Sequence, residues 1–411
     1  MSRLRRLISA IFLFIFCDSI FAQDQGLIYG KVITEDGDEY IGPIRWGKEE
    51  VYWSDMFNAS KKENKNLAYL SDRELSQLED QNSDSNIITK FISISWDWDD
   101  EYDFIHEFST AFGNIGAINI KSSDRIELAL KNGESLNLDG SGYNDVGTKI
   151  NVLDNEIGMI QLSWRNIERI EFLSTPSILN EKFGEPLYGT VKSDVGEFTG
   201  YVQWDHDERL GSDKLDGDTK DGEVSIPFNK IQSIARDGYS RSIVALKSGR
   251  ELELRGSNDV NNKNRGIIVT VEGFGRVDIE WEDFDVVVFK EAPNIGNDYR
   301  SYSAPEPIQG VVSVDNGDEH TGEIIYDLDE EYTIEVLNGK DDDTKFIIPF
   351  GNIKLIKPIG SDEAKITLKN GDTLVLEDSQ DVGKNHQGIL INTRNERVYV
   401  PWDRVELVTL K

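Results

Sequence analysis

The chain has 411 residues, with 76 acidic and 44 basic side chains, so its formal net charge at pH 7 is −32. A charge of this size repels phosphate backbones and no basic stripe offsets it, so we expect no nucleic-acid binding. The single cysteine, Cys17, excludes intramolecular disulfides and metal sites built from several cysteines.

The first 22 residues have the pattern of a secretory signal peptide. Arg3, Arg5 and Arg6 precede the apolar run Leu7–Phe16, and Ala22 supplies a small residue before the expected cleavage site. The run is shorter than the roughly 20 residues of a membrane-spanning helix, and no later stretch approaches that length. We therefore expect an exported protein of the periplasm or cell surface, with no transmembrane segment in the mature chain. Its mature charge would be −34, from 41 basic and 75 acidic residues, because residues 1–22 hold three arginines and one aspartate.

Three tandem copies of one repeat follow. Each copy opens with two runs of alternating apolar residues around a glycine-containing turn, which predicts a β-hairpin. A second hairpin is followed by a loop containing the pair Asp-Val and by a further strand. The copies span residues 27–174, 187–290 and 308–411, and proline-containing linkers join them. The sequence thus predicts an all-β protein of three repeats.

The first copy contains a long insertion at about residues 54–95. Within it Ser71 and Glu74 match a capping box ahead of Leu75 and Leu78, which predicts a short helix. Insertions of this length are often functional or disordered, and the sequence does not choose between the two.

Both halves of each copy end with an aromatic residue, two variable positions, an apolar residue and a last strand. The aromatic residues of the three copies are Phe112 and Trp164, Phe228 and Trp281, and Phe350 and Trp402. Their nearly constant separation indicates two related units per copy. Each unit resembles a small β-barrel of the SH3 or Sm type, and the whole repeat is similar to uncharacterised secreted bacterial proteins. The resemblance implies no activity. A single sandwich of eight to ten strands per copy fits the same pattern.

No catalytic motif is present in the sequence. The histidines, His106, His206, His320 and His386, are not at metal-ligand spacing, and neither a Gly-x-Ser-x-Gly turn nor a His-Glu-x-x-His helix occurs. We therefore predict a non-catalytic binding or scaffold module whose partner is an envelope protein or a glycan. A calcium-stabilised adhesive module and a carbohydrate-active hydrolase with paired acids are the alternatives.

Acidic loops provide the candidate metal sites. Calcium takes six to eight oxygen ligands, and no other cofactor is expected. One acidic run is Trp96–Glu101 in the first copy. In the second copy the predicted calcium ligands are Asp213, Asp216, Asp218, Asp221 and Glu223.

A macromolecular ligand would contact the aromatic residues that end the second strand of each copy, together with nearby acids. These predicted binding residues are Trp46, Trp204, Tyr326, Asp205, Asp207, Glu208 and Asp259. Packing in the core is the competing interpretation for the three aromatic residues. We expect the aspartates of the Asp-Val pairs, Asp145, Asp259 and Asp381, to hold a turn by hydrogen bonds to the local backbone.

Overall fold

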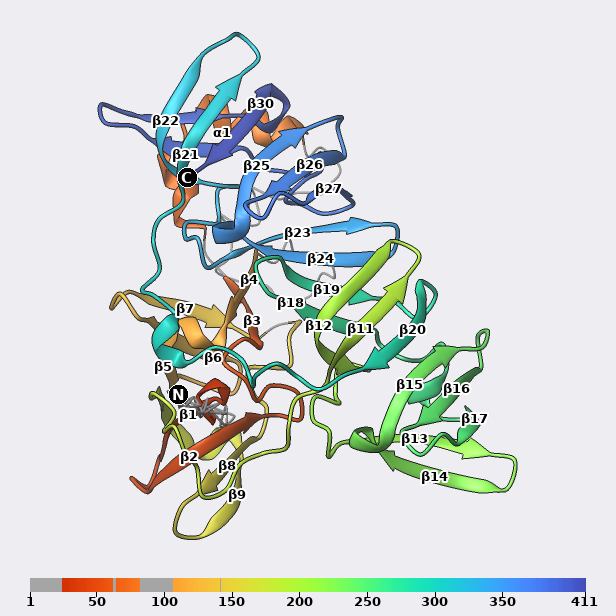
Figure 1. Ribbon diagram of the computed structural model, residues 1–411. Coiled ribbons are helices and arrows are strands. Elements are labelled where there is room, and N and C mark those ends of the chain that lie inside the picture. Colours follow the sequence, from red (N-terminus) through yellow and green to blue (C-terminus); the bar gives the residue numbers. More distant parts are fainter. Residues whose placement is uncertain (1–23, 62–63, 82–105, 141) are drawn as a thin grey trace, which may run out of the picture.

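The computed structural model describes residues 24–61, 64–81, 106–140 and 142–411, and its architecture is all-β (Figure 1). The strands form two antiparallel sheets, of ten and 20 strands. Residues 1–22, the predicted signal peptide, and the acidic run Trp96–Glu101 lie outside the described residues. No helix in the described part of the chain is long and apolar enough to cross a membrane.

Three blocks of ten strands follow one another along the chain, and we call residues 27–174 block one, 187–290 block two and 308–411 block three. Block one contains β1 (Tyr29–Thr34), β2 (Glu39–Trp46), β3 (Met56–Lys61), β4 (His106–Ala111), β5 (Ile115–Ile120), β6 (Arg125–Leu130), β7 (Ser135–Asp139), β8 (Ile150–Asp154), β9 (Gly158–Leu162) and β10 (Ile167–Phe172). Block two contains β11 (Tyr188–Ser193), β12 (Gly196–Trp204), β13 (Lys214–Thr219), β14 (Gly222–Pro227), β15 (Ile231–Arg236), β16 (Arg241–Leu246), β17 (Glu251–Arg255), β18 (Ile267–Val271), β19 (Gly275–Ile279) and β20 (Phe284–Phe289). Block three contains β21 (Gln309–Val314), β22 (Glu319–Ile325), β23 (Val336–Asp341), β24 (Thr344–Pro349), β25 (Ile353–Pro358), β26 (Glu363–Leu368), β27 (Thr373–Glu377), β28 (Ile389–Asn392), β29 (Arg397–Val400) and β30 (Val405–Leu410).

The helical elements are short. They are α1 (Asp72–Gln81) and the 3-10 helices η1 (Asp24–Gly26), η2 (Lys65–Tyr69), η3 (Phe112–Asn114), η4 (Trp164–Asn166), η5 (Phe228–Lys230), η6 (Asn258–Val260), η7 (Tyr299–Ser301), η8 (Phe350–Asn352) and η9 (Trp402–Arg404). Five of these, η3, η4, η5, η8 and η9, are formed by the aromatic-x-x-apolar motif, and each buries its aromatic ring.

The strands pair in the same order within each block. The order is β4-β3-β7-β6-β5-β10-β1-β2-β8-β9 in block one. In block two it is β14-β13-β17-β16-β15-β20-β11-β12-β18-β19. Block three repeats it as β24-β23-β27-β26-β25-β30-β21-β22-β28-β29. Strands of the first half pair with strands of the second, as β1 does with β10 and β2 with β8. The strand order divides into one set of consecutive strands, β3–β7 in block one, and a second set made of β1, β2 and β8–β10. A boundary between the first and second halves of the sequence repeat therefore does not separate the two sets.

A glycine in the second strand of each block meets the backbone of a neighbouring strand. A Cβ atom would lie 1.9 Å from the carbonyl oxygen of Leu153 at Gly42, and 2.1 Å from that of Thr270 at Gly200. No side chain fits at such distances, which explains why glycine occupies this position in each block.

The insertion of block one packs on block three. The predicted capping box is present, because the Ser71 backbone N–H donates to Glu74 Oε2 over 2.7 Å, and α1 begins at Asp72. Leu70 and Leu78 pack in one apolar cluster with Leu328 of block three. The insertion starts later than the sequence suggested, since residues 56–61 form β3.

The three blocks contact one another (Figure 1). Strand β19 of block two pairs with β24 of block three, with Val277 opposite Phe346. The linker between these two blocks crosses block one, where the ring centroid of Tyr299 lies 4.4 Å from that of Trp53. Lys131 Nζ donates to the backbone oxygen of Tyr299 over 2.6 Å.

Candidate functional site

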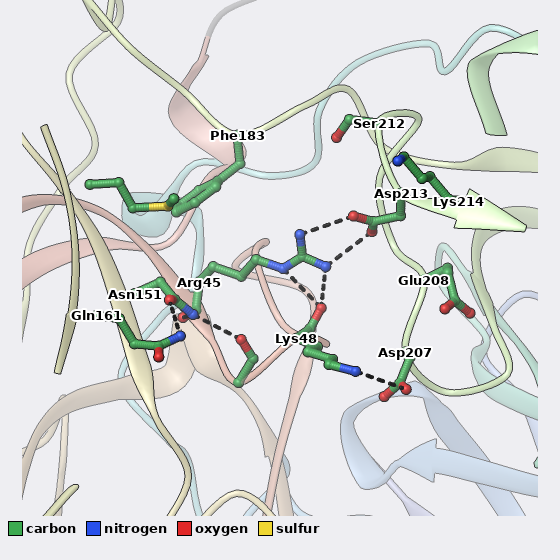
Figure 2. Close-up of a pocket in the computed structure, with 12 residues that line it drawn as sticks. Arg45, Lys48, Asn151, Gln161, Phe183, Asp207, Glu208, Ser212, Asp213 and Lys214 are labelled. Atoms are coloured by element: carbon green, nitrogen blue, oxygen red, sulfur yellow. Dashed lines mark hydrogen bonds and ion pairs between the residues drawn. The ribbon is translucent and has the colours of Figure 1, made fainter. Parts of the chain in front are cut away.

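A cleft with a volume of about 480 Å³ lies between block one and block two (Figure 2). Its charged lining residues are Arg45 and Lys48 from block one and Asp207, Glu208, Asp213 and Lys214 from block two. All three of the acids, Asp207, Glu208 and Asp213, are among the residues predicted as candidate sites from the sequence. The cleft therefore presents both signs of charge on walls that come from different blocks.

Ion pairs join the two walls of the cleft. Both terminal nitrogens of Arg45 donate to the carboxylate of Asp213, each over 3.0 Å. Lys48 Nζ lies 3.8 Å from Asp207 Oδ2 at the cleft edge. The bidentate geometry of the first pair fixes the orientation of one wall of the cleft relative to the other.

Uncharged side chains complete the lining. Asn151 and Gln161 present amide groups, and Gln161 Nε2 donates to Asn151 Oδ1 over 3.0 Å. Phe183 of the first linker supplies a half-buried aromatic ring. Planar hydrogen-bonding groups beside an apolar ring can bind a sugar or a polar peptide segment.

A second, buried ion pair joins the same two blocks close to the cleft. Arg209 of block two donates from Nε and Nη2 to Asp55 Oδ1 of block one, over 3.1 and 2.9 Å. Arg209 is 1% exposed and Asp55 is 5% exposed. Asp55 Oδ2 also accepts the backbone N–H groups of Val51 and Tyr52. Each block thus contributes one arginine and one aspartate to the junction.

The three aromatic residues predicted to contact a ligand are core residues. Trp46, Trp204 and Tyr326 are each 0% exposed. Their polar atoms are satisfied internally, because Trp46 Nε1 donates to the backbone oxygen of Asp145 over 2.8 Å, and Trp204 Nε1 donates to that of Asp259 over 2.9 Å. Stacking on a sugar ring is therefore not open to them, and the competing interpretation as core residues describes them.

The aspartates of the Asp-Val pairs make long-range contacts. Asp145 Oδ2 accepts the backbone N–H of Asn58 over 2.7 Å, Asp259 Oδ2 accepts that of Asp216 over 2.6 Å, and Asp381 Oδ2 accepts that of Asn338 over 2.6 Å. In each block this bond fixes the start of the third strand. We expected these carboxylates to hold their own turn, whereas they connect segments at least 43 residues apart.

Three of the predicted binding residues lie together. Carboxylate oxygens of Asp205, Glu208 and Asp259 are within 4.8 Å of one another. Asp207 lies apart from them at the cleft edge, where Arg265 Nη2 is 2.8 Å from its Oδ2. Burial and the neighbouring carboxylates of Asp259 and Asp205 together raise the pKa of Glu208 to about 9.

The predicted calcium ligands of the second copy do not form a site. Asp216 and Asp218 lie on β13, Asp221 lies in the turn after it, and Glu223 lies on β14 opposite Asp218. Among the described residues, the groups of three or more acids whose oxygens converge within 4.8 Å do not include them. Asp213 is occupied by Arg45 and by the backbone N–H groups of Arg209 and Leu210. The alternating pattern of this segment forms a β-hairpin, and the acidic residues are distributed along it rather than gathered in one loop.

A second acidic cluster was not predicted. Carboxylate oxygens of Glu49, Glu50 and Asp145 in block one are also within 4.8 Å of one another. The signal for it is a glutamate four residues after the aromatic residue in every copy, namely Glu50, Glu208 and Glu330. The many other acids of the chain conceal this spacing.

Comparisons with protein-family models, with curated proteins and with solved structures found no match for the chain.

Proposed function

We propose that the protein is an exported, non-catalytic binding module that holds an envelope protein or a glycan on a rigid three-block framework. The cleft between blocks one and two carries this proposal, because reciprocal ion pairs hold both of its walls in place. When a ligand binds a preformed polar site, less free energy is lost to the ordering of side chains and loops.

The chemistry of the cleft supports a polar ligand. Arg45 and Asp213 neutralise each other, whereas the side chains of Lys48, near Asp207, and of Lys214 are exposed. Both blocks contribute charge, so a ligand in the cleft would contact two blocks at once. Functional residues placed between rigid elements are a common arrangement for binding.

A site-directed cross-linking experiment tests this proposal. In a C17S background, a photo-cross-linker is attached to the cleft residue in the S212C variant and to an exposed residue of block three in the S361C variant. The native cell envelope is then illuminated with each protein, and adducts are identified by mass spectrometry. We expect one reproducible protein or glycan adduct from the cleft position that the control position does not give.

A separate incubation distinguishes binding from hydrolysis. Isolated envelope glycans are incubated with the unmodified protein, and their length distribution is measured. Unchanged glycan lengths are expected for a binding module, whereas shortened glycans would favour the carbohydrate-active hydrolase. Identical adducts from both positions, or none from either, would contradict a ligand site in the cleft.

A further inference from the structure

One glutamate is held in the same way in all three blocks. Glu50, Glu208 and Glu330 each lie four residues after the buried aromatic residue, and each forms an isolated antiparallel bridge with it. The backbone N–H of the aromatic residue donates to the glutamate carbonyl oxygen, over 2.8 Å in blocks one and two and 3.0 Å in block three. This tight loop fixes the position from which the glutamate side chain extends.

The aspartate of the Asp-Val pair is fixed near this glutamate. Its backbone oxygen accepts the hydrogen bond of the aromatic side chain, and its Oδ2 accepts a backbone N–H of the third strand. In block one the oxygens of Glu50 and Asp145 lie within 4.8 Å of each other and of Glu49. In block two Glu208 and Asp259 are equally close to each other and to Asp205.

One oxygen of each glutamate carboxylate is buried without a hydrogen-bond partner among the described residues. Oε2 of Glu50, Glu208 and Glu330 is buried and accepts no hydrogen bond from any described residue. Glu50 is 4% exposed. A buried carboxylate beside another carboxylate is costly unless a positive charge or a proton compensates it. The unpartnered oxygen therefore points to a bound species between the two acids.

Block three shows how a positive charge can be supplied. Lys61, which belongs to β3 of block one, extends into the acidic loop of block three, where its Nζ lies 3.2 Å from Asp329 Oδ1. It also pairs with Glu335 and donates to the backbone oxygen of Asp329 over 2.8 Å. Burial and the neighbouring carboxylates raise the pKa of Glu330 well above its usual range, and the charge of Lys61 opposes them only in part.

In blocks one and two the equivalent basic residues, Arg209 and Arg45, pair with Asp55 and Asp213. Burial raises the pKa of Glu50 and Asp145, and the charge of Arg276 opposes this effect without forming an ion pair with either group. Within the described ranges no ion pair reaches Glu50, Asp145, Glu208 or Asp259. Arg265 approaches the cluster of block two only from outside, where its Nε is 3.6 Å from Asp205 Oδ1.

We propose that blocks one and two each bind a calcium ion, held between Glu50 and Asp145 in one block and between Glu208 and Asp259 in the other. Glu49 and Asp205 supply further oxygens. All the ligand atoms are hard oxygens, from loops and, for Asp259, from the short 3-10 helix η6. Such a set matches the flexible coordination of calcium better than the strict octahedron of magnesium. No ion is proposed for block three, where Lys61 already places a positive charge beside Asp329, the neighbour of Glu330.

A bound ion would connect the loop after the second strand with the Asp-Val loop. In block two this loop also carries Glu208 and Asp207 into the cleft. The ion would therefore stabilise one cleft wall, although the proposal does not depend on what the cleft binds.

Terbium luminescence tests the proposal directly, because terbium replaces calcium at oxygen sites and is excited by a nearby indole. Trp46 and Trp204 each donate a hydrogen bond to the ligand aspartate, so both sites have a sensitiser. We expect saturable emission from about two ions per chain that calcium displaces. E208Q is expected to remove about half of the emission, and E50Q the other half. D221N, in the exposed hairpin turn, is the matched control and should retain all of it.

A second measurement covers variants that fail to fold. The wild-type protein is dialysed against micromolar calcium and its metal content is determined by mass spectrometry, and its melting temperature is compared in calcium and in chelator. About two ions per chain and a higher melting temperature in calcium are expected. Less than one ion per chain, or emission that neither E50Q nor E208Q reduces, would overturn the proposal and leave protons as the species held by these acids.

Discussion

Asp55, Asp213 and Glu335 occupy the same position in their blocks, nine residues after the aromatic residue. Each accepts two backbone N–H groups with one oxygen, and each pairs with a basic side chain from another block. The partners are Arg209, Arg45 and Lys61 respectively. A turn-forming residue thus also connects the blocks, so a single residue serves both local structure and assembly.

The pair of Arg209 and Asp55 gives the first prediction. R209M keeps much of the side-chain volume and leaves Asp55 buried without its positive partner, which should lower the free energy of unfolding by about 3 kcal/mol. K192M removes one partner of an ion pair whose side chains are 53% and 56% exposed, and should cost less than about 1 kcal/mol. Urea denaturation of both variants measures the difference. Equal losses would show that the buried pair contributes no more than a surface pair.

Residue-scale features differ in how far the sequence reveals them. Asp205, Glu208 and Asp259 were predicted as binding residues, and the structure brings them together. The aromatic residues near them were assigned to ligand contact as well, although each is buried. A tryptophan beside an acidic loop looks the same in a sequence whether its ring faces solvent or the core. The topology of the fold decides whether the ring is exposed or buried, and the local composition of the sequence does not contain this information.

At the scale of strands, the alternation of apolar residues predicted the hairpins correctly but not their partners. The hairpin of β1 and β2 is local, and its turn is visible as Asp36-Gly37. The pairing of β2 with β8 joins residues more than a hundred positions apart. An alternating pattern defines which face of a strand is buried and leaves its neighbour undefined. Gly42, which the close approach of β8 requires, is a sign of this pairing in the sequence.

The glycine of the second strand gives a prediction at this scale. In G200A the new Cβ would lie 2.1 Å from the Thr270 oxygen, so β12 and β18 must separate. We expect a loss of about 2 kcal/mol in the free energy of unfolding. G360A is the matched control, because a Cβ there meets no atom within 4 Å. Thermal melts of the two variants provide the comparison, and a G200A protein as stable as G360A would contradict the assigned pairing.

Across the whole molecule, each pair of blocks is joined by a different type of contact. Arg209 and Arg45 connect blocks one and two, β19 and β24 connect blocks two and three, and α1 with Lys61 connects blocks one and three. The sequence predicted the all-β class and the helix of the insertion. It did not predict these junctions, because the basic partners Arg45, Arg209 and Lys61 each occur in one block only. The edge strands β19 and β24 have equivalents in every block, so the pattern does not say which edges pair.

The framework that the proposed function requires is a single rigid body, and differential scanning calorimetry tests this most directly. If the buried junctions couple the blocks, the wild-type protein should unfold in one transition whose calorimetric enthalpy equals the van't Hoff enthalpy. Two or three separate transitions, each with the enthalpy of a single block, would show that the blocks are independent domains and would contradict the account.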